Sequence, residues 1–252
     1  MRVRLLVAYN VAPFYGFAEN LGVRSVAGNL RAALEQIVGH AVVLTCAGRT
    51  DKGVHAWGQV ISTDLEVDPA RLGRLQISLN QMCGPDIAVR ALDVAGDDFD
   101  ARHSATGRRY WYDIATGLVA SPFTASTHWH IRGSLDLEQM RTGAAHLIGT
   151  NHFGSFCKKN SSKPNATMYR NLRRVDLQTG FDELSNPTLR VELEASAFCH
   201  QMVRSIVGLL VDVGLGKRLA ADVPLVLAAR DRNAAPPIAP PHGLTLVEVT
   251  YE

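Results

Sequence analysis

Arg49 and Asp51 are the residues whose types and spacing most suggest chemistry. They stand between Gly48 and Gly53, directly after the apolar run of residues 41–44. A strand that ends in such a loop holds a carboxylate and a guanidinium at the edge of a sheet, where polar substrates commonly bind. The same spacing also fits an ordinary surface turn, with Asp51 capping its own backbone and Arg49 in solvent. The loop by itself leaves both interpretations open.

A second region with chemical potential runs from Phe99 to Tyr110 and mixes guanidinium groups with aromatic rings. It contains Arg102 and His103, and later Arg108 and Arg109. This mixture suits RNA, because arginine pairs with phosphate and aromatic rings stack on unpaired bases. The alternative is a solvated strand edge with Tyr110 half-buried.

The third region is a predicted helix over residues 198–214, in which Arg204 shares one face with His200 and Gly208. Its other side is apolar and is expected to be buried. An arginine beside such a stripe needs a carboxylate partner if it is occluded, and Asp51 is a candidate. Otherwise Arg204 extends to solvent.

Charge is unevenly distributed along the 252 residues, although the formal net charge is only +2. Residues 101–174 carry 11 Lys or Arg against 3 Asp or Glu, a local balance of +8, and the remainder carries −6. One strongly basic segment in a nearly neutral chain indicates a docking face for a polyanion.

The four cysteines, Cys46, Cys83, Cys157 and Cys199, are scattered and show no metal-ligand spacing. We expect reduced, mostly buried thiols with no metal and no disulfide, and a cytoplasmic protein. The apolar residues 5–9 are too few for a signal peptide, and residues 202–215 are too short to span a bilayer. We therefore expect no membrane association.

The first half reads as strand, helix, strand, strand, helix, strand. Strands are predicted at residues 3–9, 41–45, 58–63 and 87–94. Ser25 caps a helix that Gly39 ends, and Asp68-Pro69 opens a second helix. This order is that of a ferredoxin-like unit, an antiparallel sheet with two helices on one face.

The second half also alternates strands and helices, so it is interpreted as an elaborated copy of the first. Strands are predicted at residues 107–114, 172–177, 188–195 and 244–251, and helices at 137–147, 198–214 and 220–229. The intervening loops include one through residues 122–132, a basic one at 158–167 and a proline-rich one at 236–241.

Three motifs together give the chain a specific resemblance. They are residues 47–55 (AGRTDKGVH), 105–112 (ATGRRYWY) and 198–204 (FCHQMVR). With these motifs in order, the chain resembles the tRNA pseudouridine synthase A (TruA) family from Tyr9 to Leu244. The resemblance implies a cytoplasmic homodimer that acts on tRNA with no cofactor and no metal. It also implies an α+β fold of two ferredoxin-like (RRM-like) domains, 1–104 and 105–252, whose antiparallel sheets join with helices on one side and an active-site cleft between the halves.

The resemblance assigns roles to single residues. Asp51 corresponds to the nucleophile, Arg204 to its pairing arginine, and Tyr110 to the ring that stacks on the target uracil. Arg49 corresponds to the arginine that holds the nucleotide out of the helix, and Leu244 would line the uracil pocket. The implied reaction is isomerisation of uridine to pseudouridine at positions 38–40 of the tRNA anticodon stem-loop. Whether the carboxylate attacks C1′ or C6, or drives formation of a glycal, stays open.

The target uridine must be flipped out of its stem, and contacts to the RNA backbone would offset the unstacking cost. The resemblance places Phe99, Asp100, Ala101, Arg102 and His103 against RNA. The basic residues of the 158–170 region are expected to bind phosphate, although they also fit a solvated loop. These residues are Lys158, Lys159, Lys163 and Arg170.

The chain departs from the family pattern at its first strand. The family continues Tyr-Asp-Gly and then Gly-Trp-Gln, where this chain has Asn10 after Tyr9, and Phe17 and Ala18 after Gly16. Lys52 replaces the commoner small residue after the nucleophile. The alternative function is a catalytically silent RNA-binding module of the same fold. A small-molecule enzyme fits the basic segment poorly.

Overall fold

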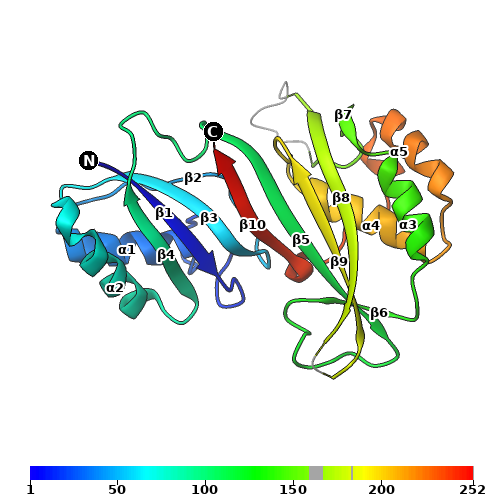
Figure 1. Cartoon of the computed structure of the whole chain (residues 1–252), viewed down its shortest axis with the longest axis horizontal. Coiled ribbons are helices and arrows are strands. Elements are labelled where there is room, and N and C mark those ends of the chain that lie inside the picture. Colours follow the sequence, from blue (N-terminus) through cyan, green and yellow to red (C-terminus); the bar gives the residue numbers. More distant parts are fainter. Residues whose placement is uncertain (159–166, 183, 252) are drawn as a thin grey trace. The chain divides into compact units, whose positions relative to one another are not determined.

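The computed structural model describes residues 1–158, 167–182 and 184–251. The chain divides into two compact units, Met1–Thr106 with Thr245–Glu252 as unit 1, and Gly107–Leu244 as unit 2 (Figure 1). Each unit combines helices with mainly antiparallel strands. The predicted α+β class is therefore confirmed, and each unit is described by itself.

Unit 1 contains a sheet with the strand order β4-β1-β3-β10, and β2 pairs with β3. The central strands β1 and β3 are antiparallel, β4 is antiparallel to β1, and β10 is parallel to β3. Helix α1 packs against α2, and α2 packs against β4. The elements are β1 (Arg2–Tyr9), α1 (Val26–Val38), β2 (Thr45–Cys46), β3 (His55–Asp64), the 3-10 turn η1 (Pro69–Arg71), α2 (Leu72–Cys83), β4 (Ile87–Val94) and β10 (Leu244–Tyr251).

The start and end of α1 follow from its sequence, as predicted. Ser25 is the N-cap, and its side chain accepts a hydrogen bond of 3.2 Å from the Gly28 N–H. Gly39 ends the helix in the left-handed conformation with φ of 79°, which favours glycine because it has no Cβ. Leu30 and Leu34, one turn apart, are fully buried.

The strand predicted at residues 41–45 is wrong for most of its length, because only Thr45–Cys46 forms β2. The Val42 N–H donates to the Glu35 carboxylate at 3.1 Å, and Val43 is 82% exposed. An apolar run that would pair as a strand is instead held by the preceding helix.

Unit 2 contains a sheet with the strand order β5-β9-β8-β7, in which neighbours are antiparallel, and β6 lies parallel to β5. The region predicted as a loop through Arg132 is wrong at its end, where β6 forms. The elements are β5 (Ala105–Gly117), β6 (Trp129–Arg132), α3 (Leu137–Ala145), β7 (Gly149–His152), β8 (Tyr169–Phe181), β9 (Pro187–Ala195), α4 (Met202–Gly214), η2 (Ala220–Asp222), α5 (Val223–Ala229), η3 (Arg232–Ala234) and η4 (Pro241–Gly243).

Helix α4 forms the centre of the unit 2 core, and Met202, Ile206 and Leu210 on it are fully buried. It begins four residues later than the predicted start at Phe198. Gln201 directly before it adopts the left-handed conformation, with φ of 68°, and the chain cannot continue a right-handed helix backward through that residue. None of the helices in the described part of the chain is long and apolar enough to cross a membrane.

Candidate functional site

The loop that carries Arg49 and Asp51 connects β2 to β3 in unit 1. Arg49 is exposed and Asp51 is partly buried. The Asp51 carbonyl accepts a hydrogen bond of 3.1 Å from the Val54 N–H, and Gly53 closes the turn with φ of 86°. The carboxylate of Asp51 therefore stands on a tight turn at the start of a buried strand.

Thr50, between the two charged residues, anchors this loop in the core. It is 6% exposed, and its hydroxyl lies 2.7 Å from the Tyr9 hydroxyl at the end of β1. The amide of Gln59, which is fully buried on β3, donates to the Gly48 carbonyl at 2.7 Å. Hydrogen bonds in a low-dielectric interior hold one geometry strongly. Arg49 and Asp51 thus flank a fixed residue.

Gly16 and Phe17, which follow β1, also contact this loop. The Phe17 N–H donates to the Thr50 carbonyl at 3.2 Å, and the buried Phe17 ring lies 6.0 Å from the Tyr9 ring. A Cβ on Gly16, whose φ is 97°, would lie 3.1 Å from the Lys52 backbone nitrogen. Phe17 is therefore a core residue in this chain, and the departure from the family pattern at this position preserves support of the loop.

Tyr110 lies on β5 of unit 2, opposite Leu193 of β9. Its ring meets the Phe198 ring edge-on, with 5.3 Å between ring centroids. Tyr112, two residues along, is on the same face of the sheet. The Tyr112 hydroxyl donates to the Pro240 carbonyl at 2.7 Å, and the Nε of Arg204 donates to the neighbouring Ala239 carbonyl, so Arg204 lies near Tyr112. Burial raises the pKa of Tyr112, and the Arg204 charge partly offsets this rise. Unit 2 thus brings Tyr110 and Arg204 to one side of its sheet.

Arg204 is fixed by the proline-rich loop. Its Nε donates to the Ala239 carbonyl at 2.7 Å, and the Ala239 N–H donates to the Arg204 carbonyl at 3.1 Å. Leu244, 6% exposed, follows Gly243, where a Cβ would lie only 2.8 Å from the Tyr112 ring. Unit 2 therefore also places Leu244 near this aromatic face.

The segment Phe99–His103 divides into structural and projecting residues. The Asp100 carboxylate accepts backbone N–H groups of Arg102 at 2.7 Å and His103 at 2.8 Å, and these bonds lower its pKa, with that from His103 the largest cause. Ala101 is fully buried; its N–H donates a hydrogen bond to the Ser62 hydroxyl, and its carbonyl accepts one from the Tyr251 hydroxyl. Phe99 packs on the Tyr251 ring at 5.0 Å. Only Arg102 and His103 are exposed.

Ion pairs in the folded structure offset some of the positive charge counted along residues 101–174. Arg109 and Arg174 both approach Glu192 of β9, at 3.7 Å and 3.3 Å, and Arg174 also pairs with Asp176 at 2.6 Å. Glu192 lies on β9, beside β5 and β8, and Asp176 lies on β8 with Arg174; both acidic residues are outside the counted window. These ion pairs therefore neutralise part of the local excess.

Arg170 differs from its neighbours. Its Nη1 donates to the backbone carbonyls of Thr167 and Tyr169, at 2.9 Å and 2.6 Å, and among the described residues it has no carboxylate partner. Burial lowers its pKa. Lys158 is exposed. Lys159 and Lys163 lie outside the described residues.

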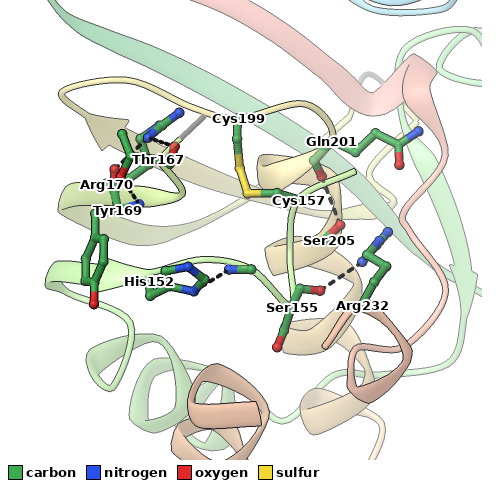
Figure 2. The surroundings of a disulfide bond; sticks show 11 residues. His152, Ser155, Cys157, Thr167, Tyr169, Arg170, Cys199, Gln201, Ser205 and Arg232 are labelled. Carbon is green, nitrogen blue, oxygen red and sulfur yellow. Dashed lines mark hydrogen bonds between the residues drawn. A yellow bond between two sulfur atoms is a disulfide. The ribbon is translucent and has the colours of Figure 1, made fainter. Parts of the chain in front are cut away.

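The expectation of four reduced thiols is wrong for two of them. Cys157 and Cys199 form a disulfide (Figure 2), and their Cα atoms lie 5.7 Å apart. Cys46 and Cys83 are free thiols, and burial raises the pKa of both. The paired cysteines are 42 residues apart in sequence, and no spacing motif reveals such a pair.

The described part of the chain contains no group of three or more His, Cys, Asp or Glu side chains arranged to hold a metal ion. Each unit contributes candidate reactive groups. Unit 1 carries the Asp51 carboxylate and the Arg49 guanidinium on one loop, and unit 2 carries the Tyr110 phenol and the Arg204 guanidinium.

Comparison with known proteins gives these groups a context. A family model described as tRNA pseudouridine synthase matches residues 144–252. A protein named tRNA pseudouridine synthase A from Shewanella amazonensis is 37% identical, over 100% of this chain and 93% of the relative. Proteins of the same name from Myxococcus xanthus and Caulobacter vibrioides are also 37% identical. These alignments cover 99% of this chain, with 92% and 98% of the respective relatives.

Proposed function

The chain belongs to the tRNA pseudouridine synthase family, and on this basis we propose that it converts uridine to pseudouridine at positions 38–40 of the tRNA anticodon stem-loop. The family makes it an isomerase. The stem-loop target is our proposal, as is the use of an aspartate nucleophile. The observation that carries the proposal is the Gly48–Gly53 loop, in which Asp51 follows Thr50. The Thr50 hydroxyl is hydrogen-bonded to Tyr9, and Gln59 donates to the Tyr9 hydroxyl and to the Gly48 carbonyl.

Asp51 is proposed as the nucleophile. Pseudouridine formation breaks the bond from N1 of uracil to C1′ of the ribose, rotates the base and rejoins it through C5. The carboxylate acts by attack at C1′, by attack at C6 or by driving glycal formation. In each case the C5 proton must leave at the end. A rigid loop favours this chemistry, because a nucleophile held in place does not lose orientational entropy in the transition state.

The other roles follow the family resemblance. Arg204 is proposed to pair with Asp51 and keep it ionised, Tyr110 to stack on the uracil, and Arg49 to hold the flipped nucleotide out of the stem. Leu244 is proposed to line the uracil pocket. Support from the structure comes unit by unit: Arg204 is oriented by Ala239, and Tyr110 is packed by Phe198.

RNA binding is proposed to offset the unstacking cost of base flipping, a few kcal/mol. The exposed Arg102 and His103 on a turn braced by Asp100, and Lys158 and Arg170 in unit 2, are the contacts that the structure supports best. Among these residues we favour Arg170 as a phosphate contact, since its guanidinium donates only to neutral backbone carbonyls among the described residues.

Three broader expectations stay proposals. The first is that both units are ferredoxin-like; the order β4-β1-β3 with α1 against α2 supports this for unit 1. The second is a cytoplasmic location. The third is a homodimer. Exposed apolar side chains at the β5–β6 connection and the β8–β9 turn offer a surface for it, and they are Leu118, Val119, Phe123, Phe181 and Leu184.

The test is to map pseudouridine on tRNA incubated with the purified protein and no added cofactor. Asp51→Asn should abolish product while tRNA affinity stays within about tenfold, or 1.4 kcal/mol. The matched control is Asp97→Asn, which removes one exposed carboxylate of unit 1 outside the loop and should leave turnover unchanged.

Two outcomes separate the alternatives. If Asp51→Asn still makes pseudouridine, the nucleophile assignment is wrong. If the unmodified protein binds tRNA and forms no pseudouridine at any position, it is a catalytically silent RNA-binding module.

A further inference from the structure

The disulfide between Cys157 and Cys199 lies in unit 2. Cys199 stands in sequence between Phe198, which packs on Tyr110, and α4, which carries Arg204. Cys157 follows β7, and Cys199 stands three residues before α4 (Figure 2). Beside it, the Lys158 N–H donates to the His200 carbonyl at 2.9 Å. The chain before α4 is thus tied to the chain after β7 by one covalent bond and one adjacent hydrogen bond.

The residues on either side of Cys199 differ in how firmly they are held. On one side α4 is packed in the core, and Met202 and Ile206 are fully buried. On the other side Phe198 is joined to Cys199 directly, and its ring packs edge-on against Tyr110. Breaking the disulfide therefore leaves α4 and Arg204 in place, and it releases Phe198 from its covalent tether.

We propose that Cys157 and Cys199 form a reversible thiol–disulfide site whose oxidised state positions Phe198 against Tyr110. The partner is a low-molecular-weight thiol and its disulfide. The two sulfur atoms differ in access, because Cys157 is only 1% exposed whereas Cys199 is partly exposed. Exchange with a small thiol therefore takes place at Cys199, since thiol–disulfide exchange depends on which sulfur can be reached.

The chemistry balances without any metal. In oxidation, the Cys199 thiolate attacks a small disulfide and releases one small thiol, which leaves a mixed disulfide on Cys199. The Cys157 thiolate then attacks the Cys199 sulfur and releases the second small thiol. The two protein thiols lose two electrons, the small disulfide gains them, and the two protons end on the released thiols. Reduction is the reverse sequence.

The expected effect of disulfide reduction on turnover rests on the proposed function. Reduction is expected to act through Tyr110, which loses a fixed contact with Phe198. An edge-on aromatic pair contributes modestly beyond its buried area, so its loss should lower kcat by about three- to tenfold. The KM for tRNA should stay within about twofold, since Arg170 and Arg102 lie on other segments and Lys158, although it follows Cys157, has its own backbone hydrogen bond to His200. In this scheme Phe198 is a positioning residue that acts through Tyr110.

The first experiment does not depend on activity. The native protein is equilibrated with graded ratios of reduced to oxidised dithiothreitol, the free thiols are alkylated, and the peptides are identified by mass. We expect Cys157 and Cys199 to become alkylated together in one transition, while Cys46 and Cys83 are alkylated after unfolding at every ratio. Separate transitions for Cys157 and Cys199, or thiols at both positions under every oxidising ratio, would overturn the proposal.

A second measurement tests which sulfur exchanges. Cys157→Ser incubated with oxidised 2-mercaptoethanol should carry a mixed disulfide on Cys199, whereas Cys199→Ser should leave Cys157 largely unmodified. Equal or reversed labelling would contradict exchange at Cys199.

The third measurement follows pseudouridine formation by the oxidised and the reduced protein. Reduction of the disulfide should lower kcat by about three- to tenfold. The double variant Cys157→Ser/Cys199→Ser should show this lower kcat in both oxidising and reducing buffer. The matched control, Cys83→Ser, should respond to reduction as the unmodified protein does. Phe198→Leu should show the lowered kcat in both redox states. Equal kcat in both states would refute the positioning role, whereas no product in either state would refute the proposed function and leave the thiol titration standing.

Discussion

Gly208 on α4 is the position where one added methyl group tests the architecture around Arg204. A Cβ there would lie 2.6 Å from the Pro237 carbonyl oxygen and 3.4 Å from the Ala239 nitrogen. Both atoms belong to backbone, so no side chain can rotate away. The same backbone exchanges two hydrogen bonds with Arg204. Gly208→Ala must therefore separate the helix from the loop that orients the guanidinium.

The magnitude comes from two opposing effects. Replacing glycine by alanine inside a helix stabilises it by up to about 1 kcal/mol. Overpacking a close contact typically costs about 1–3 kcal/mol, and each weakened hydrogen bond adds about 1 kcal/mol. The clash outweighs the helix propensity, so we expect Gly208→Ala to destabilise the protein by about 1–3 kcal/mol. Turnover should fall as well, because the peptide group that holds Arg204 is displaced.

Gly73 on α2 provides the matched control. It is also helical, it is exposed, and a Cβ there would meet no atom within 4 Å. Gly73→Ala should therefore stabilise the protein by up to about 1 kcal/mol and leave turnover unchanged. Urea denaturation, with the midpoint and slope fitted separately, measures both variants. A Gly208→Ala variant as stable as the parent protein would refute the steric reasoning.

Two further predictions concern charge. Arg170→Gln should weaken tRNA binding and make the slope of log affinity against log salt shallower by about 0.7–0.9, as expected for one lost phosphate contact. Arg174→Gln, whose charge is neutralised by Asp176 and Glu192, should leave that slope unchanged; equal slopes for the two variants would contradict the distinction. Hydrogen bonds lower the pKa of Asp100 in the folded protein, so its stabilising contribution is complete above its unfolded pKa of about 4 and is lost as the pH falls through the lower folded value. Asp100→Asn should therefore be less stable than the parent near neutral pH in thermal melts, with a difference that shrinks toward pH 2; a constant difference would exclude this linkage.

Local signals predicted the elements that are determined locally. Ser25 and Gly39 define α1 by capping chemistry that acts within a few residues, and the strand at 244–251 is found at its predicted bounds. Prediction failed where composition and spacing do not decide the backbone conformation. Residues 41–44 have strand composition, but the Val42 N–H donates to the Glu35 carboxylate of the preceding helix. The spacing from Phe198 onward fits a helix, yet the left-handed backbone of Gln201 places the start of α4 after it.

The same distinction applies to the candidate site. Asp51 could be proposed from the sequence because its motif is contiguous. The groups that hold its loop, Tyr9 and Gln59, come from two other strands and have no motif of their own. The disulfide partner of Cys199 is equally remote in sequence. Such contacts depend on strand order and register, which a single sequence does not reveal.

The charge pattern shows how a count along the chain and the field of the folded protein can differ. A window of sequence assigns Arg109 and Arg174 to a basic segment, but β9 places Glu192 between them, and that carboxylate is almost completely buried. A carboxylate in that position attracts both guanidinium groups across the strands, where the ion pairs stabilise strand pairing and weaken the attraction for phosphate. Arg170, on the same strand as Arg174, has no such carboxylate among the described residues. An RNA backbone should therefore be attracted to the Arg170 end of β8 rather than uniformly along the basic segment.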